Sequence, residues 1–171
     1  MKRGPKNARN DVSQKTIKSI FDYDRETGLL RWKVRVAKNT HIGTVAGDLD
    51  RKGRIRVSIN SIRYLAHRVI WVWVTGKWPT HEIDHCDEVK SNNAWKNLRE
   101  ATPSQNHFNI KLKKHNTSGY KGVSLTPSGR WHCKITIDYK QIYLGTFSSA
   151  EEAYDAYCKM AEKYHGSFAN L

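Results

Sequence analysis

The stretch "EIDHCDEVKSNNAWKNLREATPSQNHFN", residues 82–109, decides the fold of the first part of this chain. Its opening "EIDH", with His81 directly before it, and its later "NLREAT" have the composition of short strands, and a polar loop separates them. Thr102 is suited to cap a helix that starts at Pro103, and Gln105 completes a capping box with Thr102. The stretch therefore predicts strand, loop, strand and helix, with Asn106 in the first helical turn.

The segments before this stretch predict a short helix, several strands and a buried helix. "SQKTIKSIFDYD" offers Ser13 as a helix N-cap. "GLLRWKVR" alternates apolar and cationic side chains as a half-buried strand does, and "RIRVSINSIRY" repeats the alternation around a turn at Asn60 and Ser61. "AHRVIWVWVTG" is apolar, and we expect a buried helix that closes near Gly76.

The last third of the chain predicts an antiparallel sheet followed by one helix. "GRWHCKITIDYKQIYLGTF" alternates cleanly, which indicates two or three strands. Ser148 and Glu151 form a possible capping box for the helix. The apolar stripe of that helix would be Ala153, Tyr154, Tyr157, Met160, Ala161 and Tyr164. If this helix covers one sheet face, the opposite polar and basic face is left free to meet DNA.

Composition points to a polyanionic partner. The 171 residues include 30 Lys and Arg against 16 Asp and Glu, a net charge of +14. A basic surface gains affinity for nucleic acid by releasing condensed counterions, without reading sequence. No apolar run approaches the roughly 18 residues of a membrane span, and no secretory signal is recognisable, so we expect a cytoplasmic protein. Three distant cysteines with no C-x-x-C pair indicate reduced, mostly buried thiols.

The Asp84-His85 pair and the amide side chains after it could hydrolyse a phosphodiester. Such a reaction needs a base for water and positive charge beside the leaving oxygen. A neutral imidazole can take the proton, and carboxylate and amide oxygens suit Mg²⁺. The alternative is that the Asn residues only form turns; Asn92 and Asn93 are interpreted in that way. His67 is expected to be a structural or DNA-facing residue, and His107 and Asn109 are expected to lie on a solvated helix face or to contact a phosphate.

Residues 15–110 resemble an HNH endonuclease of the phage and intron-homing type, through Asp84-His85, Asn97 in "NLR" and Asn106 in "SQN". The resemblance implies a ββα-metal fold in which His85 activates water and Asp84 and Asn106 hold one divalent metal, Mg²⁺ or Mn²⁺. It also implies that Asn97 fixes the loop and so orients His85. Cys86 and Glu88 depart from the usual "DH-x-D-G" pattern, and no structural zinc is expected because the bracing Cys pairs are absent.

Residues 119–171 resemble the plant ethylene-response-factor (Apetala-type) DNA-binding domain, through "YLGTF", "EEAYDAY" and "GSFANL". That family meets the major groove with a three-stranded sheet. Plant members have Arg or Trp at several contact positions, so their base specificity does not transfer. The DNA contacts expected on this chain, with the basic connector included, are Lys111, Lys113, Lys114, Lys121, Ser124, Thr126, Ser128, Arg130, Lys134, Thr136, Gln141 and Tyr143.

The expected fold class is α+β, with an HNH ββα-metal region and a C-terminal three-stranded antiparallel sheet packed on one helix. The expected domains are a basic flexible tail (1–12), the nuclease domain (13–110, with its core at about 80–110), a basic linker (111–118) and the DNA-binding domain (119–171).

The expected function is a site-specific homing endonuclease that cuts double-stranded DNA and leaves 5′-phosphate and 3′-hydroxyl ends. No membrane and no small-molecule substrate are expected, and monomer and dimer both stay open. One rival is a catalytically silent DNA-binding regulator on the same scaffold. A second rival, an RNA-binding accessory protein, rests on charge and aromatic residues alone.

Overall fold

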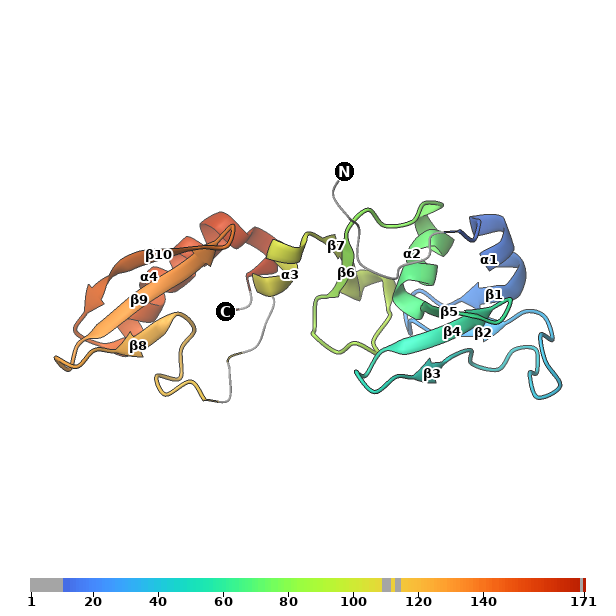
Figure 1. Ribbon diagram of the computed structural model, residues 1–171, viewed down its shortest axis with the longest axis horizontal. Helices are drawn as coiled ribbons and strands as arrows, with labels where there is room; N and C mark the ends of the chain where they lie inside the picture. The colour runs from blue at the N-terminus through green and yellow to red at the C-terminus, as the bar shows by residue number, and fades with distance from the viewer. Residues whose placement is uncertain (1–10, 109–111, 113–114, 170) are drawn as a thin grey trace. The chain divides into compact units, whose positions relative to one another are not determined.

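The computed structural model describes residues 11–108, 112, 115–169 and 171, and it divides into two compact units, Met1–Ala101 and Thr102–Leu171 (Figure 1). Each unit mixes helices with antiparallel strands, so the expected α+β class is confirmed. No helix of the described residues is long and apolar enough to cross a membrane. The limits of the four expected domains stay a prediction.

The first unit begins with helix α1 (Gln14–Ile20) and a two-stranded ribbon, β1 (Phe21–Tyr23) and β2 (Leu30–Trp32). Ser13 accepts a hydrogen bond from the Thr16 N–H, which confirms the predicted N-cap. The strand predicted for "GLLRWKVR" was too long, because β1 offers only three partner residues and the ladder ends at Trp32. Beyond it the chain forms a loop in which Val34 is 39% exposed.

A three-stranded antiparallel sheet follows, in the order β3 (Asp48–Leu49), β4 (Ile55–Ile59), β5 (Ile62–Leu65). Asn60 and Ser61 both have positive φ, as the tight turn of a two-residue hairpin requires, so the predicted turn is confirmed. Helix α2 (Ala66–Thr75) starts directly after β5 and ends at Gly76, whose φ is 80°. The predicted buried helix is confirmed.

The core of the first unit joins α1, the two small sheets and α2. Its fully buried side chains include Ile17, Phe21, Val57, Val69 and Ile70. The hairpin formed by β6 (Glu82–His85) and β7 (Leu98–Ala101) packs on this core through Ile83 and Leu98. Residues 86–94, here the hairpin loop, connect the two strands as predicted, together with a short helix that was not predicted, η1 (Trp95–Asn97).

The second unit opens with helix α3 (Pro103–Phe108). Thr102 Oγ1 accepts from the Gln105 N–H at 3.2 Å, and Gln105 Oε1 accepts from the Thr102 N–H at 2.9 Å. The predicted capping box and helix start are confirmed. Of the basic connector, Lys111, Lys113 and Lys114 lie outside the described residues.

The rest of this unit is a three-stranded antiparallel sheet with one long helix across one face (Figure 1), which confirms the expected architecture. The strands are β8 (Val123–Leu125), β9 (Trp131–Ile137) and β10 (Lys140–Phe147), and the helix is α4 (Ala150–His165), followed by η2 (Gly166–Phe168). Cys133 of β9 and Ala153 of α4 are fully buried between them.

Two details of helix α4 were predicted wrongly. The N-cap is Ser149, not Ser148: its side chain accepts from the Glu152 N–H, and the Glu152 carboxylate in turn accepts from Ser148. The apolar stripe is also shorter than predicted, since Tyr164 is 50% exposed while the next residue, His165, is buried. In the last turn it is His165 that meets the sheet, with its Nε2 3.2 Å from the Thr136 carbonyl oxygen of β9, and the apolar pattern alone could not show this.

The three cysteines are free thiols: Cys133 is buried, Cys158 is half-buried and Cys86 is exposed. The expectation of mostly buried cysteines is therefore wrong for Cys86, which follows directly after β6 at the start of the hairpin loop.

Candidate active site

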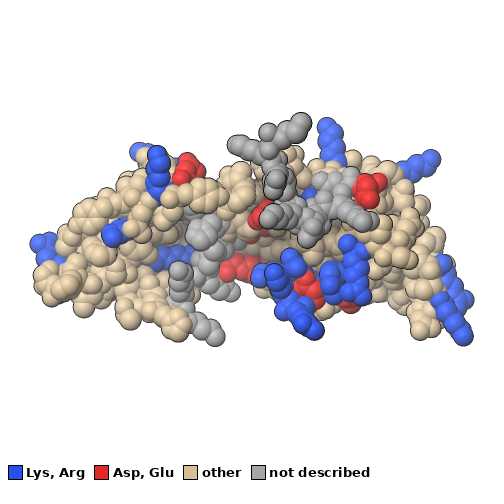
Figure 2. Space-filling view, viewed as in Figure 1, with Lys and Arg blue, Asp and Glu red and all other residues tan. Residues whose placement is uncertain are grey.

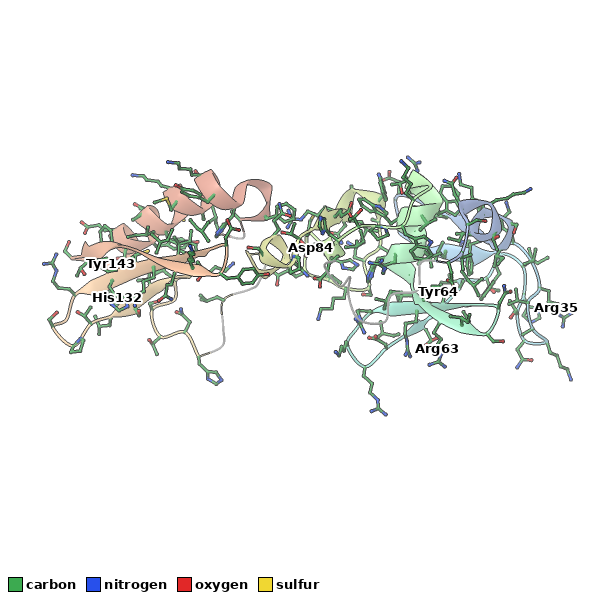
Figure 3. All side chains as sticks on the ribbon, turned by 45° about the horizontal axis from the view of Figure 1, so that its top comes forward. Arg35, Arg63, Tyr64, Asp84, His132 and Tyr143 are labelled. Carbon is green, nitrogen blue, oxygen red and sulfur yellow. The ribbon has the colours of Figure 1, made fainter. Side chains whose placement is uncertain are left out.

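Asp84 and His85 end strand β6, and both side chains are only 6% exposed. The register of the hairpin places Arg99 of β7 opposite Asp84. Arg99 donates from Nε and Nη2 to Asp84 Oδ2, at 2.9 and 2.8 Å. A buried carboxylate needs such a partner, because an uncompensated charge in a dry environment is strongly unfavourable. The pairing holds the Asp84 carboxylate in one orientation at the hairpin (Figure 3).

His85 is oriented by a residue of the hairpin loop. Its Nε2 lies 3.0 Å from Oδ1 of Asn93, which is itself 3% exposed. An amide oxygen only accepts, so in this arrangement Nε2 carries the proton and the lone pair lies on Nδ1. The interpretation of Asn93 as a turn residue alone was wrong. No sequence signal separates it from its neighbour Asn92, because burial decides the difference.

The β1–β2 turn holds the backbone of Asn93. The buried Tyr23 hydroxyl donates to the Asn93 carbonyl at 2.8 Å, and burial raises the pKa of Tyr23, so the hydroxyl stays protonated. The Trp95 N–H donates to the Arg25 carbonyl at 2.8 Å. Gly28, with φ +74°, packs so closely that a Cβ there would lie 2.2 Å from the Ala94 nitrogen. The partner of His85 is thus fixed from outside the hairpin.

Asn97 closes the hairpin loop with three hydrogen bonds. Its Oδ1 accepts from the Asp87 N–H at 2.9 Å, and its Nδ2 donates to Asp87 Oδ1 at 2.8 Å and to the Asn92 carbonyl at 2.7 Å. Burial raises the pKa of Asp87, but hydrogen bonds from Asn92, the Val89 N–H and Asn97 outweigh burial and hold that pKa below its usual range. An ionised Asp87 therefore accepts both amide groups.

His67 of α2 packs edge-on against the His85 ring, with the ring centroids 5.1 Å apart. Burial first, and then the neighbouring charges, lower the pKa of His67 to about 3, so the ring is neutral near pH 7. Its Nδ1 is buried and has no hydrogen-bond partner among the described residues. His67 is therefore a structural residue behind His85, in line with the structural alternative derived from the sequence.

The predicted metal ligands come from different parts of the chain. Asp84 lies on β6, and Asn106 lies on α3 of the second unit. Within the described residues, no group of three or more His, Cys, Asp or Glu side chains is arranged to hold a metal ion. The predicted pair contains one carboxylate and one amide, both hard oxygen donors that suit Mg²⁺. It stays a prediction.

Five of the nine predicted DNA contacts that the structure describes lie on the sheet face opposite α4. Cross-strand pairs align Ser124 with His132, Lys134 with Tyr143, and Thr136 with Gln141, while the alternate residues of β9 are buried. Figure 3 shows His132 and Tyr143 on this sheet. Lys121 lies just before β8, and Thr126, Ser128 and Arg130 lie in the β8–β9 turn.

Two polar residues of this face, His132 and Thr146, are not among the DNA contacts predicted from the sequence. His132 Nε2 lies 2.6 Å from Ser124 Oγ, and the Tyr143 hydroxyl is hydrogen-bonded to Thr146 Oγ1. In the turn, Thr126 Oγ1 bonds to Ser128 Oγ and to the Arg130 backbone, so these hydroxyls close the turn. The strand alternation itself could have found His132, because it shares the parity of Lys134 and Thr136.

Comparison with known proteins agrees with both units. The family model for HNH endonuclease matches residues 64–108, and that for the AP2 domain matches residues 118–167. Protein 3.8 of Escherichia phage T7 is 34% identical over 107 residues, which are 61% of this chain and 88% of that protein. The chain belongs to the HNH endonuclease family. It also carries an AP2 domain.

Other relatives match this chain over only part of their own length. An uncharacterized HNH endonuclease of Acanthamoeba polyphaga mimivirus is 34% identical over 105 residues, 60% of this chain and 54% of that protein. An AP2/ERF and B3 domain-containing transcription repressor of Arabidopsis thaliana is 35% identical over 63 residues, 37% of this chain and 18% of that protein. No solved structure matches the chain.

Proposed function

We propose that the chain is a site-specific homing endonuclease that hydrolyses DNA phosphodiester bonds with one divalent metal and leaves 5′-phosphate and 3′-hydroxyl ends. The observation that carries the proposal is the buried His85, whose Nε2 is bound to Asn93 directly beside the Arg99-bound Asp84. Its membership of the HNH endonuclease family supports the same reaction class.

His85 is the general base of this proposal. With its Nε2 proton donated to Asn93, Nδ1 takes the proton from the attacking water. The fixed ring matters, because a base acts only within hydrogen-bond reach of the proton that it removes. Asn97 acts indirectly: it closes the loop that carries Asn93 and so keeps the imidazole in place.

Asp84 and Asn106 are the proposed ligands of the metal. The donor set fits Mg²⁺ or Mn²⁺, because carboxylate and amide oxygens are hard donors. Arg99 orients the Asp84 carboxylate through one of its oxygens, Oδ2. When bound, the metal supplies positive charge that offsets the negative charge on the leaving oxygen. Asp84 thus holds the charge in place, and Arg99 keeps the ligand from rotating.

The AP2 sheet is the proposed docking surface for double-stranded DNA. Its face opposite α4 is polar and presents Lys134, Gln141 and Tyr143, which are suited to phosphates and base edges. The residues that we propose as DNA contacts are those predicted from the sequence, with His132 and Thr146 added. The division of labour is that the sheet positions the duplex and the hairpin cuts it.

A direct test incubates the purified chain with genomic DNA, with and without Mg²⁺, and maps new 5′ ends on each strand. Discrete metal-dependent ends that disappear in the His85→Ala variant are expected, with duplex binding retained. The Gln141→Ala/Tyr143→Ala variant should no longer produce 5′ ends at discrete positions. It should still hydrolyse DNA in a metal-dependent way, at scattered positions. Loss of duplex binding in His85→Ala would make His85 a contact residue and would contradict the assignment.

A second candidate is a catalytically silent DNA-binding regulator on the same scaffold. It is favoured by the AP2/ERF relatives, which are named as a transcription repressor and as transcription factors. The same experiment separates the two, since a regulator binds discrete sites and produces no new 5′ ends at any Mg²⁺ concentration.

A further inference from the structure

Most of the positive charge of the chain lies outside the AP2 unit. Residues 102–171 contain nine Lys and Arg against five Asp and Glu, a net charge of +4 of the total +14. Residues 31–63 alone contain nine Lys and Arg against Asp48 and Asp50, a net charge of +7. A polyanion that met only the AP2 unit would leave a net charge of +10, out of the total +14, unused.

Part of this charge is carried by a rigid turn, residues 50–54, here the cationic turn, which joins β3 to β4. Asp50 Oδ1 accepts from the Lys52 and Arg54 N–H groups, at 2.8 and 3.0 Å. Asp50 Oδ2 accepts from Arg54 Nε and Nη2, at 3.0 and 2.7 Å. These bonds from Arg54, with that from the Lys52 N–H, lower the pKa of Asp50 despite partial desolvation. The turn is therefore held by an ionised carboxylate.

The acidic side chains of this segment are already engaged, and the outermost cations are not. Asp50 is paired with Arg54, and Asp48 with Arg56 at 3.0 Å. Arg51 and Lys52 are exposed, and no ion pair joins either of them to a carboxylate among the described residues. Two cations at the tip of a rigid turn are thus available to an external anion at little conformational cost.

The cationic turn lies within electrostatic reach of His67, the residue behind His85. The pKa of His67 is lowered mainly by burial and then by the charges of His85 and Arg68. The charge of Arg54, in the cationic turn, lowers this pKa as well, and that of Asp50 raises it. His67 in turn packs on the His85 ring. Figure 2 shows Lys and Arg side chains, with acidic groups between them, gathered over β3 and β4.

We propose that the cationic turn, through Arg51 and Lys52, binds backbone phosphates of the substrate duplex beside the phosphodiester bond that is attacked by the water from which His85 takes a proton. This second DNA-binding surface rests on the proposed function, because it takes the duplex as substrate. Its contacts supply affinity by counterion release and carry no sequence information, since phosphates are alike at every position. The AP2 sheet would then select the site, and the cationic turn would hold the flanking strand against the hairpin.

The test compares two variants of the full chain that lose the same charge. Arg51→Gln/Lys52→Gln removes the exposed cations of the turn. Lys15→Gln/Lys77→Gln removes two exposed lysines on α1 and after α2, away from the turn. Binding of a random-sequence duplex is measured over a range of salt concentrations. The slope of log K against log salt should fall by about 2 in the turn variant, since each phosphate contact contributes about 0.9, and should stay unchanged in the control.

Every outcome decides the proposal. Equal slopes in the two variants would overturn it, as would a turn variant that loses affinity only for the discrete target site, because that result would mean base contacts. A turn variant with raised KM and unchanged kcat supports it, since the turn supplies binding and no catalytic group. If the wild-type chain binds no duplex, the proposed function falls as well, and this is read from the wild type alone.

Discussion

Replacing Gly28 by alanine tests how the β1–β2 turn holds Asn93, the hydrogen-bond partner of the proposed general base His85. Gly28 has φ +74°, and an added Cβ would meet the Ala94 nitrogen at 2.2 Å and the Asn93 carbonyl carbon at 2.3 Å. An ordinary contact begins at 3.4 Å, so the backbone at residues 93–94 must retreat by 1.2 Å. This displacement weakens two hydrogen bonds, from the Tyr23 hydroxyl to the Asn93 carbonyl and from the Trp95 N–H to the Arg25 carbonyl.

Gly53 provides a matched control, because its φ is +76° and no described atom lies within 4 Å of an added Cβ. Gly53→Ala therefore carries only the left-handed backbone penalty, about 1 kcal/mol. Gly28→Ala adds two weakened hydrogen bonds at about 1 kcal/mol each, so we expect a loss of about 3 kcal/mol in the free energy of unfolding.

The assay is calorimetric unfolding of the full-length variants, followed by the DNA cleavage rate. A domain of this size loses about 4–8 °C in Tm per kcal/mol, so the first-unit transition should fall about three times as far in Gly28→Ala as in Gly53→Ala. The cleavage rate at saturating DNA should also fall only in Gly28→Ala, because only that change displaces Asn93, whereas Gly53 lies in the cationic turn and can affect only DNA binding. Equal Tm losses, or equal cleavage rates at a temperature where both variants are folded, would refute the reasoning.

Three other substitutions test the site. Asn97→Ala removes three hydrogen bonds from the hairpin loop and should lower cleavage while duplex binding, measured by electrophoretic shift, is kept; unchanged cleavage would contradict the loop-closing role. Arg99→Met removes two charge-assisted bonds from Asp84 and should destabilise the first unit by about 3 kcal/mol, whereas Arg99→Lys should lose less; equal losses in urea unfolding would show that the forked geometry is unimportant. His67→Phe keeps a ring against His85 and removes a buried nitrogen that has no hydrogen-bond partner among the described residues, so it should preserve both the Tm and the cleavage rate. His67→Ala removes the ring, so both the Tm and the cleavage rate should fall. Because the pKa of His67 is lowered from 6.5 to about 3, the fold is fully stable with respect to this group above pH 6.5 and loses stability as the pH falls toward 3. The Tm of the wild type should therefore decline more steeply between pH 6.5 and 3 than the Tm of His67→Phe. Parallel curves of Tm against pH would contradict the buried neutral state of His67.

Local chemistry made most elements predictable. The Thr102 capping box, the Gly76 helix end and the Asn60-Ser61 turn each depend on residues a few positions apart, and the structure confirms all three. The strand predicted through Val34 failed because a strand needs a partner, and β1 ends after three residues. The helix cap at Ser148 failed by one residue because Ser149 and Glu152 satisfy the same spacing rule.

For this protein, the sequence by itself determined the order of the elements, the family and the short motif that contains Asp84, His85 and Asn97. Those features depend on spacing and residue type, which are written along the chain. Only the tertiary structure decided that Asn93, and not Asn92, holds His85, and that Tyr23 and Gly28 support Asn93. The reason is burial: which of two identical amides faces a histidine depends on segments some 70 residues apart, and no local pattern encodes that contact.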